Sequence, residues 1–262
     1  FVESLGMYLV ENHHRLAVLA VDPSSSRSGG SIMADKTRME KLSVEKAAFI
    51  RPSPAGGTLG GVARKTRETM LLCEAAGFDV IIVETVGVGQ SETTVASMVD
   101  FFLVLMLAGA GDELQGIKKG ILELADAVAI NKADGDNVEK ARMAGKKYEA
   151  ALHLLSPEIP DWSPPVLTCS GLTTSGIDRI WQTVLDHRKR MAQNGMLERK
   201  RREQALAWMW DLLEEGLKQR FYKHPHVKSQ MSRIEREVER GTLSPMAAVH
   251  TLLFSLDNGT AL

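Results

Sequence analysis

Four residues that follow an apolar run have the types needed to read a guanine base. Asn131-Lys132-Ala133-Asp134 comes directly after residues 125–130, which we expect to form a buried strand. Open α/β sheets bind ligands at the carboxyl ends of their strands. The Asp134 carboxylate can accept hydrogen bonds from guanine N1–H and from the 2-amino group, two donors that adenine lacks. The segment predicts guanine selection, although Asn-Lys-x-Asp also suits an ordinary turn.

Three carboxylates follow other apolar runs or glycines and are candidate Mg²⁺ ligands. Glu84 ends the run 81–83, and Gly87 lies three residues later, where a backbone N–H can approach a γ-phosphate. Asp22 ends the run 16–21, and Asp35 follows two glycines. Turn or helix capping is the alternative role for Asp22 and Asp35.

The segment 109–118 combines glycines with a carboxylate, an amide and an amine, those of Asp112, Gln115 and Lys118. A loop of this composition can rearrange when a γ-phosphate is lost, and its side chains can position water or offset transition-state charge. We therefore regard these three as candidate catalytic residues. The alternative is a helix that starts here with Asp112 as its cap.

Small residues follow the apolar run 166–168. Ser170 and Gly171 offer backbone N–H groups that can contact guanine O6. This weak pattern gains meaning only if Asp134 lies beside it, as two parallel strands would allow.

The elements needed to position these residues alternate between short apolar runs and amphipathic segments. This pattern predicts an α/β fold with a mostly parallel, doubly wound sheet flanked by helices. The expected strands span residues 16–21, 47–50, 80–83, 101–107, 127–130 and 166–168. The expected helices between them span residues 2–11, 62–76, 91–98, 117–125, 138–155 and 176–193.

After residue 193 the pattern of alternating strands and helices ends, and long charged helical segments without predicted strands follow. We expect helices at residues 196–222, 227–240 and 245–256, and thus two domains, 1–193 and 194–262. The apolar positions of 205–213 recur at helical spacing and include two Trp. The apolar helix face that they form can pack against a partner or against its own domain. His224-Pro225-His226 predicts a helix break rather than a metal site, because no third ligand is near.

Composition narrows the function class. The formal net charge of −1 argues against nucleic acid as the main partner. Cys73 and Cys169 are far apart and outside any Cys-x-x-Cys spacing, so we expect two buried thiols rather than a disulfide or zinc site. No apolar stretch approaches the length of a membrane span, and we expect a cytoplasmic protein.

Ordered motifs along nearly the whole chain resemble the MeaB/ArgK family of GTPases, which belongs to the SIMIBI class of P-loop proteins. The motifs that carry the resemblance are Val21-Asp22-Pro23-Ser24-Ser25, Asp35-Lys36-Thr37-Arg38-Met39, Gly57-Thr58-Leu59-Gly60-Gly61, Glu84-Thr85-Val86-Gly87-Val88-Gly89-Gln90-Ser91-Glu92, Gly111-Asp112-Glu113-Leu114-Gln115-Gly116-Ile117-Lys118 and Asn131-Lys132-Ala133-Asp134.

The resemblance implies binding of GTP and GDP with Mg²⁺, slow hydrolysis, a homodimer formed through carboxyl-terminal helices, and a chaperone role toward adenosylcobalamin-dependent methylmalonyl-CoA mutase. From the net charge and the lack of a long apolar stretch, we expect no contact with nucleic acid or membrane. The residues that match the family's Mg²⁺ acids are Asp22, Asp35 and Glu84. Those that match its guanine-binding residues are Asn131, Lys132 and Asp134, supported by Ser170 and Gly171. Asp112, Gln115 and Lys118 match its mutase-responsive loop.

One departure from the family concerns the phosphates. No Gly-x-x-x-x-Gly-Lys-Ser/Thr occurs in the 262 residues, and residues 1–6 resemble the helix that follows this loop. We therefore expect residues 1–193 to be a GTPase domain that lacks its first strand and phosphate loop. Such a chain should bind GTP poorly, because the loop's N–H groups and Lys stabilise the phosphates.

Two other functions compete with the chaperone interpretation. A kinase linked to lysine, arginine and ornithine transport, the family's historical label, would prefer ATP, which disagrees with the chemistry of Asp134. A GTPase that delivers a metal would need a Cys/His-rich loop, and the sequence has isolated cysteines and scattered histidines.

Overall fold

The computed structural model describes residues 1–21, 39–51, 59–85, 91–108, 119–154 and 162–257. Two compact units divide the chain, residues Phe1–Gln204 and Ala205–Leu262. This division reflects contacts within each unit, and the functional boundary expected after residue 193 stays a prediction.

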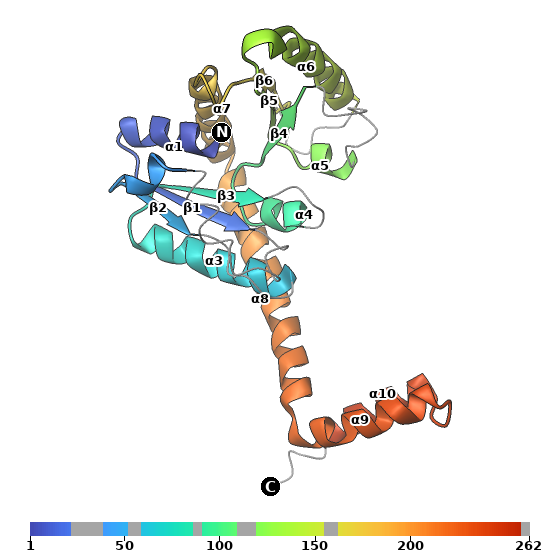
Figure 1. Ribbon diagram of the computed structural model, residues 1–262. Coiled ribbons are helices and arrows are strands. Elements are labelled where there is room, and N and C mark those ends of the chain that lie inside the picture. The colour runs from blue at the N-terminus through green and yellow to red at the C-terminus, as the bar shows by residue number, and fades with distance from the viewer. Residues whose placement is uncertain (22–38, 52–58, 86–90, 109–118, 155–161, 258–262) are drawn as a thin grey trace. The chain divides into compact units, whose positions relative to one another are not determined.

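Two parallel three-stranded sheets form the frame of the first unit (Figure 1). The first has the order β2-β1-β3, formed by Ala48–Arg51, Leu16–Val21 and Val80–Thr85. The second has the order β4-β5-β6, formed by Leu103–Leu107, Ala127–Asn131 and Val166–Thr168. The α/β class is thus confirmed, and the runs of Val, Ile, Leu and Ala suit strands covered on both faces.

Helices connect the strands in the alternation that the sequence predicts. They are α1 (Val2–Glu11), α3 (Leu59–Ala75), α4 (Ser91–Ala96), α5 (Lys119–Glu123), α6 (Val138–His153) and α7 (Ile177–Gln193), with the short 3₁₀ turns η2 (Leu42–Val44) and η3 (Gly135–Asn137). Helix α5 stops before the expected residue 125. The N–H groups of Leu124 and Ala125 donate to the carbonyls of Ile121 and Leu122, so the last turn tightens into i→i+3 bonds.

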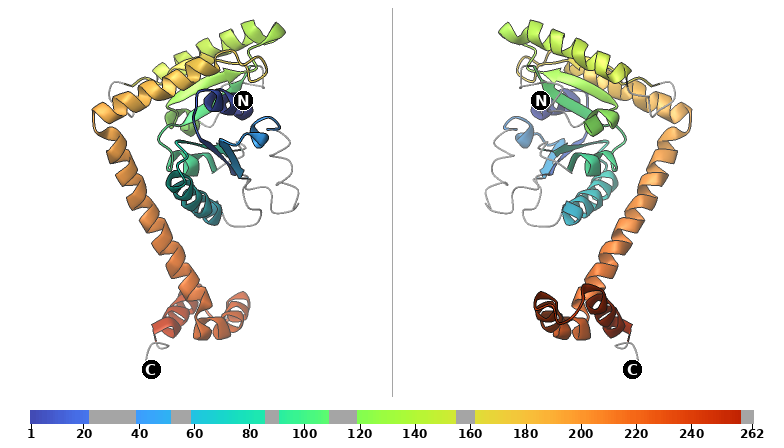
Figure 2. Two further views of the ribbon diagram at one scale, coloured as in Figure 1. Left: turned by 90° about the vertical axis from the view of Figure 1, so that its left-hand side faces the viewer. Right: turned by 90° about the vertical axis from the view of Figure 1, so that its right-hand side faces the viewer.

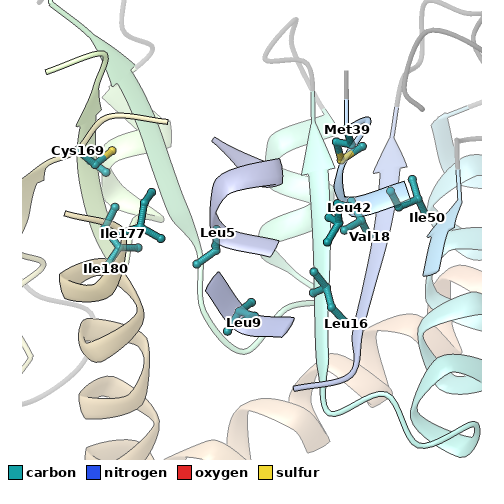
Figure 3. Packing of buried hydrophobic residues seen from close by; sticks show 11 residues of the cluster. Leu5, Leu9, Leu16, Val18, Met39, Leu42, Ile50, Cys169, Ile177 and Ile180 are labelled. Carbon is teal, nitrogen blue, oxygen red and sulfur yellow. The ribbon is translucent and has the colours of Figure 1, made fainter. Parts of the chain in front are cut away.

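The core of the first unit joins both sheets through α1. Leu5 and Leu9 of this helix lie between Ile177 and Ile180 of α7 and the β1 residues Leu16 and Val18 (Figure 3). Helix α1 therefore fixes one sheet against the other by apolar burial.

Each sheet has two edge strands within the described residues, β2 and β3 in the first sheet and β4 and β6 in the second. Strand β3 pairs with β1 alone, and β4 pairs with β5 alone. The central strand β1 is buried throughout, whereas β3 is half-buried along its length. On β4, Leu105 and Leu107 keep 41% and 40% of their surface exposed. These two edges look unlike the interior of a parallel sheet.

Helices make up the carboxyl-terminal region. Helix α8 (Met196–Lys223) is one unbroken helix, and it is followed by α9 (Pro225–Glu239) and α10 (Pro245–Asp257) (Figure 2). Pro225 is the first residue of α9, so the predicted helix break is confirmed. In the second unit α9 packs on α10, with Val227, Ile234 and Ala248 buried. None of the described helices is long and apolar enough to cross a membrane.

Candidate functional site

The carboxyl ends of β5 and β6 bring two predicted site segments together. Ile130 is in register with Thr168. Beyond the strands the backbone pairing continues, because Cys169 N–H donates to Ile130 O at 2.9 Å and Ala133 N–H donates to Cys169 O at 2.9 Å. The segments 131–134 and 169–171 therefore form one surface at this sheet edge, as parallel strands require.

Asn131 ties the two segments to each other. Its Oδ1 accepts a hydrogen bond from Gly171 N–H at 3.1 Å and lies 3.7 Å from Cys169 Sγ. The next residue, Lys132, has a φ of +60°, a left-handed conformation that is uncommon for a residue with a side chain. Asn137 Nδ2 donates to Lys132 O at 2.7 Å and supports this turn. Left-handed backbone at a residue with a side chain is often found at functional sites, where the surrounding structure holds it in place.

Ser170 holds the carboxylate of Asp134. The Ser170 side chain is fully buried, and its hydroxyl donates to Asp134 Oδ2. The N–H groups of Leu172 and Thr173 both donate to Ser170 Oγ at 3.1 Å. Because these two donors occupy the acceptor sites of the hydroxyl, its single proton is directed to Asp134. Asp134 Oδ1 has no hydrogen-bond partner among the described residues, so this carboxylate can accept two donors from a planar base.

A glycine lets the start of α1 approach the same loop. A Cβ added at Gly171 would lie 2.8 Å from Phe1 N and 3.0 Å from Phe1 Cα, both backbone atoms. Ser4 Oγ donates to Gly171 O at 2.5 Å. The loop is thus fixed from one side by Asn131 and from the other by α1.

A second glycine shapes the turn that leads into α7. Gly176 has a φ of +77°, and a Cβ there would lie 2.5 Å from Thr168 O. Ser170 N–H donates to Ser175 O at 2.9 Å and closes the turn. Sequence reasoning missed Ser4, Asn137 and Gly176. For Gly176, the only signal was its place directly before an amphipathic run.

The predicted phosphate and metal residues fall mostly outside the described residues. Asp22, Asp35 and Gly87 lie there, as do Asp112, Gln115 and Lys118. Glu84 is described. It lies near the carboxyl end of β3, opposite Ala20 of β1, and is half-buried. Within the described residues, no group of three or more His, Cys, Asp or Glu side chains lies close enough together to hold a metal ion. The carboxylate of Glu84, near the carboxyl end of β3, is the kind of oxygen ligand that Mg²⁺ prefers.

Both cysteines are buried, as the sequence predicts. Burial raises the pKa of the Cys169 thiol to about 11, and burial also raises the pKa of Cys73. Cys169 therefore remains a neutral thiol behind Asn131 and serves as a small packing residue.

The model of the protein family described as "Methylmalonyl Co-A mutase-associated GTPase MeaB" matches residues 1–226. The chain belongs to the MeaB family. A "Putative GTPase" of Caulobacter vibrioides is 58% identical over 252 residues, which cover 96% of this chain and 77% of that protein. "GTPase ArgK" of Escherichia coli is 48% identical over 96% of this chain and 76% of its own length. This MeaB-family chain is a GTPase that binds guanine nucleotide.

Two further relatives extend the comparison. The "Methylmalonic aciduria type A homolog, mitochondrial" of Mus musculus is 49% identical over 97% of this chain and 61% of that protein. The solved structure of an "LAO/AO transport system kinase" superposes with a TM-score of 0.72 at 40% identity and covers 98% of this chain and 76% of its own. The nickel complex of HypB from Helicobacter pylori shares the fold at 20% identity, with a TM-score of 0.51, over 72% of this chain and 80% of its own.

Proposed function

We propose that this MeaB-family GTPase is a chaperone of an adenosylcobalamin-dependent methylmalonyl-CoA mutase and couples its nucleotide state to loading or protection of the mutase cofactor. The observation that carries the nucleotide part is the Asp134 carboxylate, held by buried Ser170 at the carboxyl ends of β5 and β6. The mutase part is supported by the family's description as mutase-associated.

In this proposal the described residues divide the work of holding the base. Asp134 accepts guanine N1–H and the 2-amino group, and Ser170 keeps the carboxylate in place. The N–H groups of Ser170 and Gly171, which the sequence predicts at guanine O6, instead donate to Ser175 O and Asn131 Oδ1. Asn131 braces the loop, and the exposed Lys132 lays its aliphatic stem along the base. Each hydrogen bond to the ionised carboxylate is stronger than a neutral one, which gives guanine its advantage over adenine.

We also propose that residues 1–193 form a GTPase domain that is completed by a parallel strand and its phosphate-binding loop between β3 and β4. The support is that β3 and β4 are edge strands of different sheets, which α1 already holds in one core. A strand in that place would cover Leu105 and Leu107. A version of the chain that includes such a strand and loop before Phe1 is called the extended protein below.

Mg²⁺ binding is part of the same proposal. Glu84, together with Asp22 and Asp35, supplies carboxylate oxygens, and Gly87 allows backbone approach to the γ-phosphate. When bound, Mg²⁺ neutralises charge that develops on the β- and γ-phosphate oxygens. Asp112, Gln115 and Lys118 act as the catalytic loop, which responds to the mutase.

The test is GTP hydrolysis by the extended protein, alone and with purified methylmalonyl-CoA mutase, with ATP as the control nucleotide. We expect the mutase to accelerate GTP turnover, because a slow GTPase with a client-responsive loop needs an external trigger. Equal rates of GTP hydrolysis with and without the mutase would be consistent with a GTPase but would contradict the mutase as its client.

The Lys118→Ala variant should keep basal turnover and lose the stimulated part.

The alternative is a nucleotide-dependent kinase linked to lysine, arginine and ornithine transport, which the name of the 40% identical structure supports. This function predicts ATP preference and transfer of the γ-phosphate to a protein. The ATP control therefore separates the two functions, since the chemistry of Asp134 favours guanine.

We propose that the protein is a homodimer through its carboxyl-terminal helices. Leu206, Met209, Trp210, Leu213 and Leu217 of α8 are all exposed, and they recur at the spacing of one helix face. A second copy related by a two-fold axis is the default occupant of such a face. Leu213→Asp should shift the protein to monomers in analytical ultracentrifugation. The matched variant Gln219→Asp, at an exposed polar position of the same helix, should stay dimeric, and equal behaviour of the two variants would remove α8 as the interface.

A further inference from the structure

A buried carboxylate lies at the sheet edge opposite the guanine-reading residues. Asp126 directly precedes β5, and its side chain is 8% exposed. Its Oδ2 accepts a hydrogen bond from Phe102 N–H at 2.8 Å, just before β4 begins, and lies 3.6 Å from Lys200 Nζ of α8. One carboxylate thus joins the amino ends of two strands and the start of the carboxyl-terminal helix.

Two aromatic rings pack on His187, which lies beside this carboxylate. His187 of α7 is 2% exposed, and its Nε2 lies 3.4 Å from Asp126 Oδ1. Trp162 Nε1 donates to Asp126 O at 2.9 Å, and its ring meets the His187 ring edge-on, with 4.9 Å between the ring centroids. Phe101 packs on His187 in the same way at 5.1 Å. Removing the ammonium group beside a buried carboxylate destabilises a protein, because the carboxylate is then left buried without a partner.

Three polar residues in the first turns of α8 bind the segment before β4. Lys200 Nζ donates to Asp100 O at 3.0 Å, and Gln204 Nε2 donates to Val99 O at 2.9 Å. Arg201 makes two hydrogen bonds to the Asp100 carboxylate, at 2.8 and 2.5 Å. The hydrogen bonds to Asp100 raise the pKa of Arg201, so this guanidinium stays charged. All of these contacts lie within the first unit.

The neighbouring Arg199 supplies an internal comparison. It lies on the same turn of α8 but pairs with Glu203 of its own helix at 2.8 Å, and both side chains are largely exposed. Arg199 and Arg201 thus have the same residue type and helical setting. They differ in whether the partner belongs to α8 or to the segment before β4.

The strands link this cluster to the nucleotide site. Asp126 directly precedes β5, and Asn131 is its last residue. Phe102 directly precedes β4, and the segment 109–118 follows shortly after that strand. Strands β4 and β5 pair along their length, so both run from this cluster to the edge where the guanine-reading residues lie.

We propose that Asp126, Lys200, Asp100 and Arg201 form a joint that fixes the first turns of α8 to the amino ends of β4 and β5 and passes nucleotide-dependent movement of these strands into α8. These are positioning residues, since none of them is near the guanine-reading residues. The transmission part rests on the proposed guanine site. The anchoring part stands without nucleotide.

Hydrogen exchange of the amides of residues 200–204 tests the joint in the extended protein. Without nucleotide, Arg201→Gln should raise their exchange rates by about threefold to fivefold, because two hydrogen bonds to the segment before β4 are lost. Arg199→Gln loses only an ion pair within α8 and should raise the rates by no more than about twofold. Lys200→Met should have a larger effect because it leaves Asp126 buried without its cation. If Lys200→Met fails to fold, the Arg201→Gln and Arg199→Gln pair still decides the result.

The same peptides are then followed with GDP and with a non-hydrolysable GTP analogue. The wild type and Arg199→Gln should show a difference between the two nucleotides, and Arg201→Gln should show a smaller one. A wild type without any difference, or an Arg201→Gln variant that keeps the full difference, would overturn the joint. Binding of a fluorescent GDP is measured separately. A protein that binds no GDP would contradict the proposed guanine site rather than the joint. The nucleotide-free comparison of Arg201→Gln with Arg199→Gln would then still test the anchoring of α8.

Discussion

Replacing Asp134 by alanine should weaken GDP binding to the extended protein by at least about 100-fold, because each hydrogen bond to an ionised carboxylate contributes about 1.5–3 kcal/mol and two are lost. ATP binding should not weaken in parallel, since adenine lacks both donors. The loss should therefore appear as a loss of the preference for guanine over adenine nucleotides. Calorimetric titration with GDP, GTP and ATP measures it.

Asp136→Ala is the matched control for this variant. Asp136 lies two residues further on in the 3₁₀ turn η3, is exposed and carries the same charge. Its removal changes the net charge equally and should leave the affinity for GDP near wild type. Similar losses in both variants would assign the effect to general electrostatics and would contradict the role of Asp134 as the guanine reader.

Replacing Gly171 by alanine should lower both stability and guanine-nucleotide affinity. The added Cβ would lie 2.8 Å from Phe1 N and 3.0 Å from Phe1 Cα, so backbone rather than a flexible side chain has to move. Forcing atoms into a packed place costs about 1–3 kcal/mol. The displaced loop also carries the N–H that donates to Asn131 Oδ1 and the Ser170 hydroxyl that holds Asp134. We expect a weakening of GDP binding of about tenfold, since loop displacement costs on the order of 1.4 kcal/mol.

Gly216→Ala provides the contrast for this substitution. Gly216 lies within α8, and a Cβ there meets no atom within 4 Å. Alanine is the better helix former by about 1 kcal/mol, so this variant should fold stably and keep the wild-type affinity for GDP, whatever its effect on the proposed dimer face of α8. Chemical denaturation and GDP titration of both variants make the comparison. A Gly171→Ala protein that behaves like Gly216→Ala would show that the contact between α1 and the loop is unimportant.

The strands were predictable because the signal for each is local. The run Leu16–Val21 was predicted with its bounds, and Val166–Thr168 likewise. The run Leu16–Val21 is apolar throughout, which suits a central parallel strand buried on both faces, as β1 is. Helix ends were less predictable. The helix expected at residues 91–98 ends at Ala96, where the N–H of Met98 turns back to Val95 O in a tighter bond.

Part of the candidate site was also readable from the chain. Asp134 and Asn131 stand in one tetrapeptide, and the chemistry of guanine requires an acceptor of that type. The support of Asp134 by Ser170 was expected from the family resemblance, and the structure brings the two residues into hydrogen-bond contact across 36 positions of sequence. The roles of these residues toward a nucleotide stay predictions.

The sequence by itself determined the alternation of strands and helices, the helical carboxyl-terminal region and the residue types of the guanine reader, because each depends on neighbours within a few positions. Tertiary structure alone decided the contacts between distant segments. Ser4 meets Gly171 across 167 positions, and Arg201 meets Asp100 across 101. No local preference encodes such a pair, since a hydrogen bond of this kind forms only after packing of α1, α7 and the sheets has already brought its two partners to the same place.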